Sequence, residues 1–395
     1  MAGTPGKDRR LRIGTVNGED KIEMELYIAG GCGEHGRNCF YLETEDIAWL
    51  VDCGVMAGAE EDGKFPHLNE KQIGKLRAVF LTHSHADHTG AIPWLLRQGY
   101  EGPIIATTPT FSQLPFECHQ KMELDKICMP TEKGTIGKLE VGWGRSGHCE
   151  GSVWLQFFTE NKTILFSGDY TEASKIYPCD RLRDRYANLA VVDCAYGHDT
   201  QVDVEYIDNV VKTVKGLLTK GRMVFLPVPK YGRGLDLLLL LSGEIPEIPL
   251  YGDEHFMQQA QRACHGGEWY RTFPGEYLQR LQHLKEETLK SEGIIFLSDP
   301  QLRGVTGECA RILLEAGACG VMTGTPEPGS FSEELLKSGK MIFVRYPVHL
   351  NEASCRKLLA ENQIERVVYY HSTEFCCENR IKILVKNNKN SIAKK

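Results

Sequence analysis

The sequence predicts an α/β fold made of two kinds of layer, and three features of the chain indicate it. The first half alternates short β-rich runs with turns, strand-like and helical runs alternate after about residue 200, and two strand-like runs return around a helical run after residue 340. Sheets covered by helices account for the first pattern, and a parallel sheet with crossover helices accounts for the second. Because 395 residues are too many for one ordinary core, we expect two domains, or one domain with another inserted into it.

The expected strands of the first half are runs of β-branched, aliphatic and aromatic residues bounded by turn residues. In chain order they are IEMELYIAGG, NCFYLETEDIAWLVDCG, KLRAVFLT, GPIIATTP, KLEVGWG, SVWLQFFTE, KTILFSGDY and LAVVDCAYG. Helical runs such as AIPWLLRQGY lie between them. This order predicts sheets with helices on their outer faces.

The second half begins with an amphipathic helical pattern over residues 203–220. A buried strand at RMVFLPV, a helix at GLDLLLLLSG and a strand at EIPLYGD follow it. The last strands, MIFVRYPV and RVVYYH, enclose a helix at SCRKLLAEN. The polar tail NNKNSIAKK has the composition of a disordered segment.

Composition places the chain among soluble globular proteins, with 42% hydrophobic and 25% charged residues. No apolar run reaches the roughly 20 residues of a membrane helix, and MAGTPGKDRR lacks the apolar core of a signal peptide. We therefore expect a cytoplasmic protein, or a nuclear one in a eukaryotic cell, with no membrane partner. The 14 scattered cysteines indicate free thiols, and Cys376 and Cys377 are interpreted as packing residues.

The net charge of −7 argues against binding nucleic acid by broad charge neutralisation. A nucleic-acid partner would have to lie in a local groove where bound metal ions supply much of the positive charge.

The stretch LTHSHADHTG follows a predicted strand and carries the densest group of metal-capable side chains. His83, His85, Asp87 and His88 lie within six consecutive positions. Zinc-type ions favour imidazole nitrogen and carboxylate oxygen, with several donors together and an open position when the metal is catalytic. In such a turn, His83 and His85 can face one ion while Asp87 and His88 face a second.

Three later residues lie at or just after the ends of predicted strands in the same way, namely His148 after KLEVGWG, Asp169 in ILFSGDYTE and His371 in RVVYYH. One strand-end histidine alone is more often hydrogen-bonded than metal-bound. Together with the histidine-rich turn, these residues predict a centre for two metal ions, zinc being expected and manganese the alternative.

Four motifs in order, DCG at 52–54, HSHADH at 83–88, GHCEGS at 147–152 and SGDY at 167–170, resemble those of the metallo-β-lactamase fold. That fold is an αββα sandwich with a two-metal site. The resemblance implies ligands to the first metal at His83, His85 and His148, ligands to the second at Asp87, His88 and His371, a bridging carboxylate at Asp169, and an orienting carboxylate at Asp52.

The later motifs VVDCAYG, PKYGRGLDLLLLL, VMTGTPEPGSFSEELLKSG, PVHLNEAS and YYHSTE resemble the β-CASP branch of that fold. This branch contains nucleases such as ribonuclease J, the endonuclease of pre-mRNA 3′-end cleavage, and Artemis. The resemblance implies an α/β domain inserted into the sandwich. The expected parts are residues 1–200 of the sandwich, the insertion at 201–340, the end of the sandwich at 341–386 and a tail at 387–395.

The resemblance implies a metal-dependent nuclease in which water activated by two metals attacks a phosphodiester. His349 is the candidate general acid and Asp193 the residue that orients it, with a buried structural pair as the alternative. RNA-cleaving members generally have glutamate at the position of Asp193, whereas DNA-specific members generally lack a histidine at that of His371. This chain combines aspartate with histidine, so RNA is favoured and DNA stays open.

Two glycine-containing loops offer groups for substrate phosphates: Lys230 and Arg233 in KYGRGLD, and Thr323, Gly324, Thr325, Gly329 and Ser330 in TGTPEPGS. Both also fit ordinary turns. His119, Lys121 and Lys126 are weaker candidates for a groove, because charged helix faces are usually only solvated.

Two other functions remain open. A small-molecule hydrolase acting on thioesters, lactones or lactams would use the same ligands but would not need residues 200–340, Asp193 or His349. A non-catalytic scaffold would be expected to have lost ligands, and this chain keeps them all. The expected enzyme works alone or as a homo-oligomer.

Overall fold

The computed structural model describes residues 22–159, 162–285 and 292–384. The tail at 387–395, expected to be disordered, lies outside the described residues. Within them, no helix is long and apolar enough to cross a membrane.

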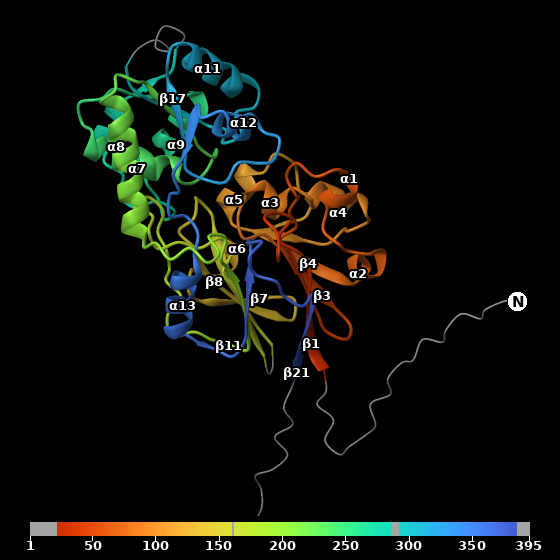
Figure 1. Cartoon of the computed structure of the whole chain (residues 1–395). Coiled ribbons are helices and arrows are strands. Elements are labelled where there is room, and N and C mark those ends of the chain that lie inside the picture. Colours follow the sequence, from red (N-terminus) through yellow and green to blue (C-terminus); the bar gives the residue numbers. More distant parts are fainter. Residues whose placement is uncertain (1–21, 160–161, 286–291, 385–395) are drawn as a thin grey trace, which may run out of the picture.

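Two facing β-sheets form the lower part of the molecule in Figure 1, and the strands of the first stand in the order β21-β1-β2-β3-β4-β5-β6. Those strands are β1 (Ile22–Gly30), β2 (Cys39–Glu43), β3 (Ala48–Val51), β4 (Leu76–Phe80), β5 (Ile104–Ala106), β6 (Lys121–Glu123) and β21 (Arg380–Leu384). The second sheet has the order β20-β12-β10-β9-β8-β7. Its strands are β7 (Lys133–Ile136), β8 (Leu139–Arg145), β9 (Val153–Phe158), β10 (Thr163–Phe166), β12 (Leu189–Asp193) and β20 (Val367–Tyr370).

Helices cover the outer faces of the two sheets, which makes an αββα sandwich. They are α1 (Glu61–Lys64), α2 (Glu70–Lys75), α3 (Ala86–Thr89), α4 (Ile92–Arg97), α5 (Thr108–Gln113), α6 (Leu124–Ile127) and α13 (Glu352–Ala360). A short pair, β11 (Tyr186–Ala187) and β19 (Gln363–Ile364), lies beside the second sheet.

Strand β2 shows why these runs are apolar without strict alternation. Phe40 and Leu42 face the core between the two sheets, whereas Cys39 and Tyr41 face the core under α2 and α4. Because side chains on a strand alternate between its faces, a strand buried on both sides has to be apolar throughout. The expected sandwich is therefore confirmed.

The upper part of Figure 1 is a separate α/β layer, inserted between β12 and α13 of the sandwich. Its six parallel strands have the order β15-β14-β16-β13-β17-β18. They are β13 (Val224–Pro227), β14 (Leu250–Gly252), β15 (Leu281–His283), β16 (Ile294–Leu297), β17 (Cys319–Met322) and β18 (Met341–Phe343). The helices are α7 (Asp203–Leu218), α8 (Gly234–Glu244), α9 (Glu254–His265), α10 (Gly275–Arg280), α11 (Gly304–Glu315) and α12 (Phe331–Lys337).

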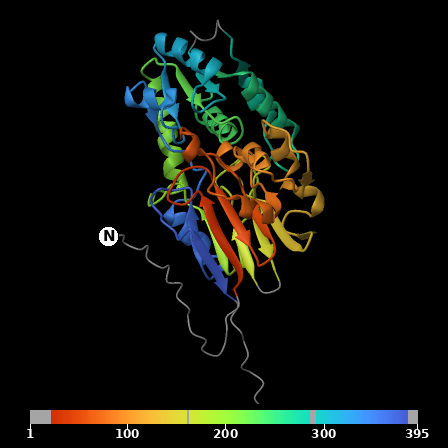
Figure 2. The ribbon, with the colours of Figure 1, turned by 90° about the vertical axis from the view of Figure 1, so that its right-hand side faces the viewer.

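Both faces of the inserted sheet are buried. In β13, Val224 and Leu226 pack with residues of α7, α8 and α9, while Phe225 packs with residues of α11 and α12. Figure 2 shows this layer above the sandwich, in which β1, in red, and β21, in dark blue, are neighbours. Strand β18 lies beyond the expected domain limit at residue 340 yet pairs with β17, so the inserted sheet extends past that limit.

The expectation of free thiols in place of disulfides is wrong at one pair. Cys32 and Cys377 form a disulfide across a sequence separation of 345 residues, and the other twelve cysteines are free. The loop after β1 and the loop before β21 meet because these two strands are neighbours in the first sheet. Cys377 is therefore bonded to Cys32 and does not act as a simple packing residue.

Candidate metal centre

The predicted ligands come together at the strand ends that face the inserted domain. His83 follows β4, Asp87 and His88 lie on α3, and His148 lies in the loop between β8 and β9. Asp169 and His371 follow β10 and β20, which both run parallel to β12. Parallel strands bring their carboxyl ends to one edge, so residues far apart in sequence meet there.

A first group of donors consists of His83, His85, His148 and Asp169. His85 Nδ1 lies 3.1 Å from His83 Nε2 and 3.2 Å from His148 Nε2. Oδ2 of Asp169 lies 3.5 Å from Nε2 of both His83 and His148. Four donor atoms in so small a space fit a tetrahedral zinc-type site.

Hydrogen bonds on the outer side of these imidazoles leave lone pairs that face one another. His85 Nε2 lies 3.0 Å from the carbonyl oxygen of Tyr231, and His148 Nδ1 lies 3.0 Å from that of Val348. A carbonyl oxygen only accepts, so these nitrogens carry the ring protons and the opposite nitrogens are bare acceptors. The two acceptors, 3.2 Å apart, repel each other unless a cation lies between them. The donor set therefore fits a metal ion.

Burial strengthens this conclusion. It lowers the pKa of His83, His85 and His148, because a charged imidazole loses its hydration in the interior. Neutral imidazoles are the form that binds metal.

A second group consists of Asp87, His88 and His371, with Asp169 beside it. His371 Nε2 lies 3.1 Å from Asp87 Oδ2, and His88 Nε2 lies 3.2 Å from Asp169 Oδ1. Nδ1 of His371 is buried without a hydrogen-bond partner among the described residues, 3.4 Å from Asp169 Oδ1. Asp169 thus directs one oxygen to each group, as a bridging carboxylate would.

The carboxylates favour positive charge at this second group. Burial acts to lower the pKa of His371, but Asp169 and Asp87 raise it to about 10. The same balance holds at His88, where burial is outweighed by Asp169, Asp52 and Asp87 and the pKa is raised. A divalent cation supplies such a charge without protonating its ligands.

Asp52 is not in either donor group, but it orients His88 through a hydrogen bond. Its Oδ2 accepts from His88 Nδ1 and from Thr82 Oγ1, both at 2.8 Å, and its Oδ1 accepts from the Thr82 backbone N–H. The bond to Nδ1 leaves Nε2 of His88 as the nitrogen available to a metal. Asp52 and His371 have φ of 60° and 68°, so backbone strain is stored at this site.

A close backbone contact explains why position 54 of the DCG motif is a glycine. A Cβ at this position would lie 1.6 Å from the carbonyl oxygen of Asp87. The absence of a side chain lets the chain after β3 pass against α3, where Asp87 and His88 are held.

His349 and Asp193 form a pair next to the two donor groups. His349 Nδ1 lies 3.0 Å from Asp193 Oδ2 and 3.7 Å from Asp169 Oδ2. Asn351 caps α13 by accepting from the Ser354 N–H, which fixes the start of the helix two residues after His349. Asp193 is fully buried, and the His349 side chain is 14% exposed.

Sequence reasoning missed two residues of the centre. Asn38 directs Nδ2 to within 2.9 Å of His88 Nε2 and 3.4 Å of Asp87 Oδ2. His35, which is exposed, places its ring 5.8 Å from that of His371. A neutral amide has no recognisable metal pattern, but a histidine within the glycine-rich run GGCGEHGRNC was a signal that could have been used.

The phosphate candidates fall into three kinds. Arg233 donates from Nε to Thr323 Oγ1 at 3.0 Å, and a Cβ on Gly324 would lie 2.2 Å from its guanidinium, so these three residues are in contact. Lys230 and Thr325 are exposed. Ser330 is engaged as the cap of α12, where it accepts from the Glu333 N–H. Gly329 lies in the turn before that cap.

The three groove candidates are exposed residues. Lys121 lies 5.5 Å from the ring centre of Phe111, and among the described residues neither His119 nor Lys126 forms a hydrogen bond or ion pair with a predicted metal ligand. They stay predictions.

Comparison with known proteins agrees with this geometry. Residues 32–207 match the metallo-beta-lactamase superfamily. The chain is 29% identical over 270 residues to the transcription termination factor FttA of Methanothermobacter thermautotrophicus, an alignment that covers 59% of this chain and 42% of that protein. It is 25% identical over 257 residues to a probable RNase MJ4 of Methanocaldococcus jannaschii, with 58% and 59% covered.

The chain therefore spans only about half the length of these relatives. A crystal structure of a protein of unknown function from Enterococcus faecalis V583 matches 92% of this chain and all of its own length, with a TM-score of 0.56 and 13% identity. At that identity the match supports the fold alone.

Proposed function

Because the chain contains a metallo-β-lactamase superfamily domain, we propose that it is a two-metal nuclease that hydrolyses phosphodiester bonds, with RNA as the favoured polymer. One observation carries the proposal: Asp169 lies between the two donor groups, with Oδ2 near His83 and His148 and Oδ1 near His88 and His371. The names of the relatives, a transcription termination factor and a probable RNase, support RNA as substrate.

Two zinc ions, or manganese, would be held by His83, His85 and His148 and by Asp87, His88 and His371, with Asp169 between them. Ions bound there would supply Lewis acidity, which lowers the pKa of water and stabilises charge on phosphate oxygens.

His349 is the proposed general acid. A proton on Nδ1 is donated to Asp193 Oδ2 at 3.0 Å, so Nε2 is the nitrogen that can carry a proton to the leaving ribose oxygen. Asp193 fixes this tautomer and stabilises the imidazolium. A phosphodiester joins O3′ of one ribose to O5′ of the next, so protonation of O3′ would leave a 5′-phosphate and protonation of O5′ would leave a 3′-phosphate.

Arg233 is the proposed contact for a substrate phosphate. Only its Nε has a hydrogen bond to another described residue, Thr323, and it forms no ion pair within the described part of the chain. A guanidinium with free N–H groups beside Gly324 can donate to a phosphate. Lys230, Thr325 and Ser330 are proposed as weaker contributors, Ser330 through its backbone.

The direct test is cleavage of labelled RNA and DNA of matched sequence, with 5′ ends free or blocked, by protein loaded with zinc or manganese. We expect RNA to be cut faster than DNA, and the acidic net charge predicts only a moderate dependence of binding on salt. Turnover of a β-lactam, thioester or lactone without cleavage of either polymer would support the small-molecule hydrolase and end the nuclease proposal.

A further inference from the structure

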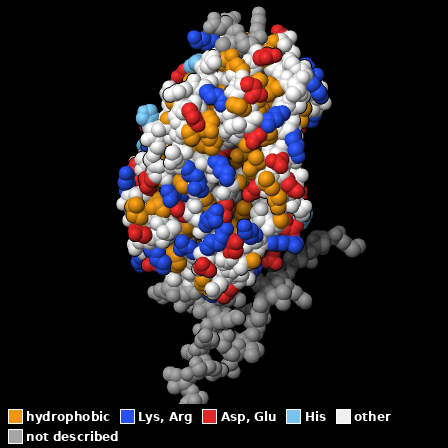
Figure 3. Space-filling model, turned by 90° about the vertical axis from the view of Figure 1, so that its left-hand side faces the viewer, with side chains coloured by type: hydrophobic (Ala, Val, Ile, Leu, Met, Phe, Trp, Pro, Cys, Tyr) orange, Lys and Arg blue, Asp and Glu red, His pale blue; other side chains and the backbone are white. Residues whose placement is uncertain are grey.

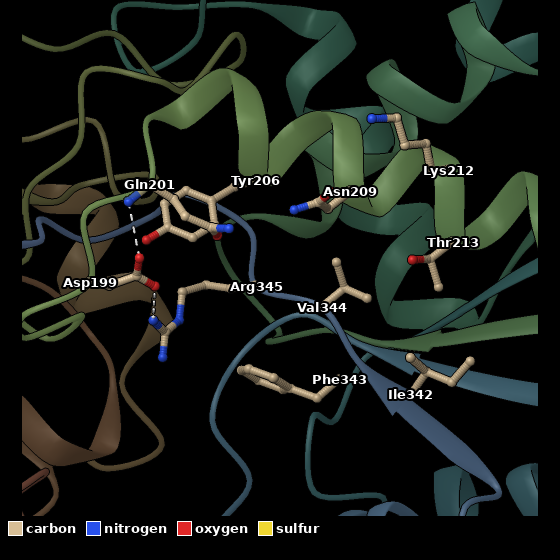
Figure 4. A pocket seen from close by; sticks show the side chains of 10 residues that line it. All are labelled: Asp199, Gln201, Tyr206, Asn209, Lys212, Thr213, Ile342, Phe343, Val344 and Arg345. Atoms are coloured by element: carbon tan, nitrogen blue, oxygen red, sulfur yellow. Dashed lines mark hydrogen bonds and ion pairs between the residues drawn. The ribbon is translucent and has the colours of Figure 1, made fainter.

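A cavity of about 520 Å³ lies apart from the metal centre, between α7 and the edge strand β18 of the inserted sheet (Figure 4). Its wall also contains Gln201 from the segment that enters the inserted domain and Arg345 from the segment that leaves it. The cavity therefore lies where the two connections between the domains meet. Its volume is within the range of about 300–1,000 Å³ found for small-molecule sites.

One side of the cavity is an exposed apolar surface. Phe343 is 41% exposed and Ile342 is 38% exposed, although large apolar side chains on a strand are usually covered. The guanidinium of Arg345 lies 5.9 Å from the ring centre of Phe343. An aromatic ring with a cation beside it is a surface on which a flat, electron-rich ring can stack.

The other side carries polar groups that have no partner. Asn209, Lys212 and Thr213 lie along α7, with Asn209 and Thr213 on the side that faces β18 (Figure 4). None of their side chains makes a hydrogen bond or ion pair with another of the described residues. Arg345, by contrast, is paired with Asp199 at 2.8 Å. The cavity thus offers one uncommitted ammonium group and two uncommitted neutral groups.

The face around the cavity carries charged groups of both signs. Figure 3 shows the face that carries α7 and α13, where Lys and Arg side chains gather around the middle with hydrophobic side chains among them. A ligand with a flat ring and a negative charge matches Phe343 and the uncommitted ammonium group of Lys212.

We propose that this cavity binds one nucleotide, its base against Phe343 and its phosphate near Lys212. The choice of a nucleotide over other aromatic anions rests on the proposed function. A mononucleotide and a nucleotide within an RNA strand both offer a base and a phosphate.

Contacts connect the cavity to the reaction centre. The guanidinium of Arg345 lies 4.4 Å from the ring centre of Tyr196, and the rings of Tyr196 and His349 lie 5.4 Å apart. A ligand that displaces Arg345 therefore acts two contacts away from His349.

The test is calorimetric titration of the full chain with a chelator present, so that phosphate cannot bind through metal ions. Adenosine 5′-monophosphate, adenosine, inorganic phosphate and a three-nucleotide RNA are the probes. Phe343→Ala should weaken binding of the mononucleotide about tenfold or more, the loss expected for one stacked base. Lys212→Ala should weaken it about threefold and leave adenosine unaffected.

Lys215→Ala is the matched control, because Lys215 is on the same helix but is paired with Glu244 outside the cavity. Melting temperatures of all variants verify that they fold. Tight binding of the mononucleotide supports a free ligand, and binding of the trinucleotide alone supports an RNA strand. No binding of either at millimolar concentration, or binding that Phe343→Ala leaves unchanged, overturns the proposal, whether or not the protein cleaves RNA.

Discussion

Nε2 of His85 lies 3.0 Å from the carbonyl oxygen of Tyr231, so a ligand in the sandwich is oriented by the backbone of the inserted domain. The next residue, Gly232, is held in turn, because its carbonyl oxygen accepts from Tyr177 Oη at 3.1 Å. The orientation of His85, a predicted ligand, therefore depends on the loop that contains Tyr231 lying against the sandwich.

Removing the Tyr177 hydroxyl, which donates to the backbone of this loop, should weaken metal binding. Tyr177→Phe deletes one buried hydroxyl, and we expect metal affinity at the His83, His85 and His148 group to fall about tenfold, the low end for residues that orient a ligand. Titration with a competing chelator measures it. Tyr100→Phe is the control, since Tyr100 is also buried and donates to a carbonyl oxygen, that of Pro103, away from the ligands. Equal affinities for the two variants would contradict a role for the loop.

We expect Asp169 to be required for binding of both metal ions and His371 for binding of only one. Asp169→Ala removes the carboxylate that faces both donor groups, so we expect loss of both ions and of hydrolysis. His371→Ala should leave one ion per chain at the group formed by His83, His85 and His148. Elemental analysis of the purified variants gives the stoichiometry, and circular dichroism shows whether the fold is kept. Two ions per chain in Asp169→Ala would exclude a bridging carboxylate.

His349 and Asp193 should affect rate more than stability. His349→Ala is expected to keep metal content and RNA binding but to lower the single-turnover rate by roughly 10²- to 10⁴-fold, the range for a general acid. Asp193→Asn should cost less, because the proton donor remains.

A structural pair would behave in the opposite way. Leaving one buried partner alone would cost about 1–3 kcal/mol of stability and reduce activity only through loss of folded protein. Melting temperature compared with single-turnover rate therefore separates the two roles.

Asp236 predicts a pH dependence of stability that is independent of the metal centre. Burial raises the pKa of its carboxyl group to about 6, although Ser174 and the N–H groups of Lys175 and Ile176 donate to it. The folded pKa lies above the ordinary value of about 4, so the folded state binds more protons and the free energy of unfolding falls as pH rises from about 4 to 6.

Asp236→Asn should remove that decline, because an amide can accept from the backbone and donate to Ser174 without a buried charge. The expected gain at pH 7 is about 1–3 kcal/mol. Urea unfolding of both proteins at pH 4.5 and 7 measures it. A variant that is less stable than the parent at pH 7 would show that the charge itself is needed there.

Much of the centre was predictable because its residues are of a few types at strand ends. His83, His85, Asp87 and His88 share one turn, and the parallel strands bring Asp169 and His371 to them. Asn38 could not be predicted, since an amide beside a glycine loop has no distinctive chemistry.

Other features depend on contacts that sequence patterns do not record. The bond between Cys32 and Cys377 requires β1 and β21 to be neighbours. The placement of β18 in the inserted sheet requires its pairing with β17, and a short apolar run does not specify its partner. The role of Ser330 as a helix cap could not be distinguished from phosphate binding, because both functions place a serine in a glycine-containing turn before a helix.

The pairing of β21 with β1 also sets the order in which the protein can be assembled during translation. All six strands of the inserted sheet are complete by Phe343, so this layer can form while later residues are still being added. The sandwich has to wait for β20 and β21, and the second donor group has to wait for His371. The proposed nuclease therefore does not gain its full set of predicted ligands beside its own messenger RNA until His371 has left the ribosome.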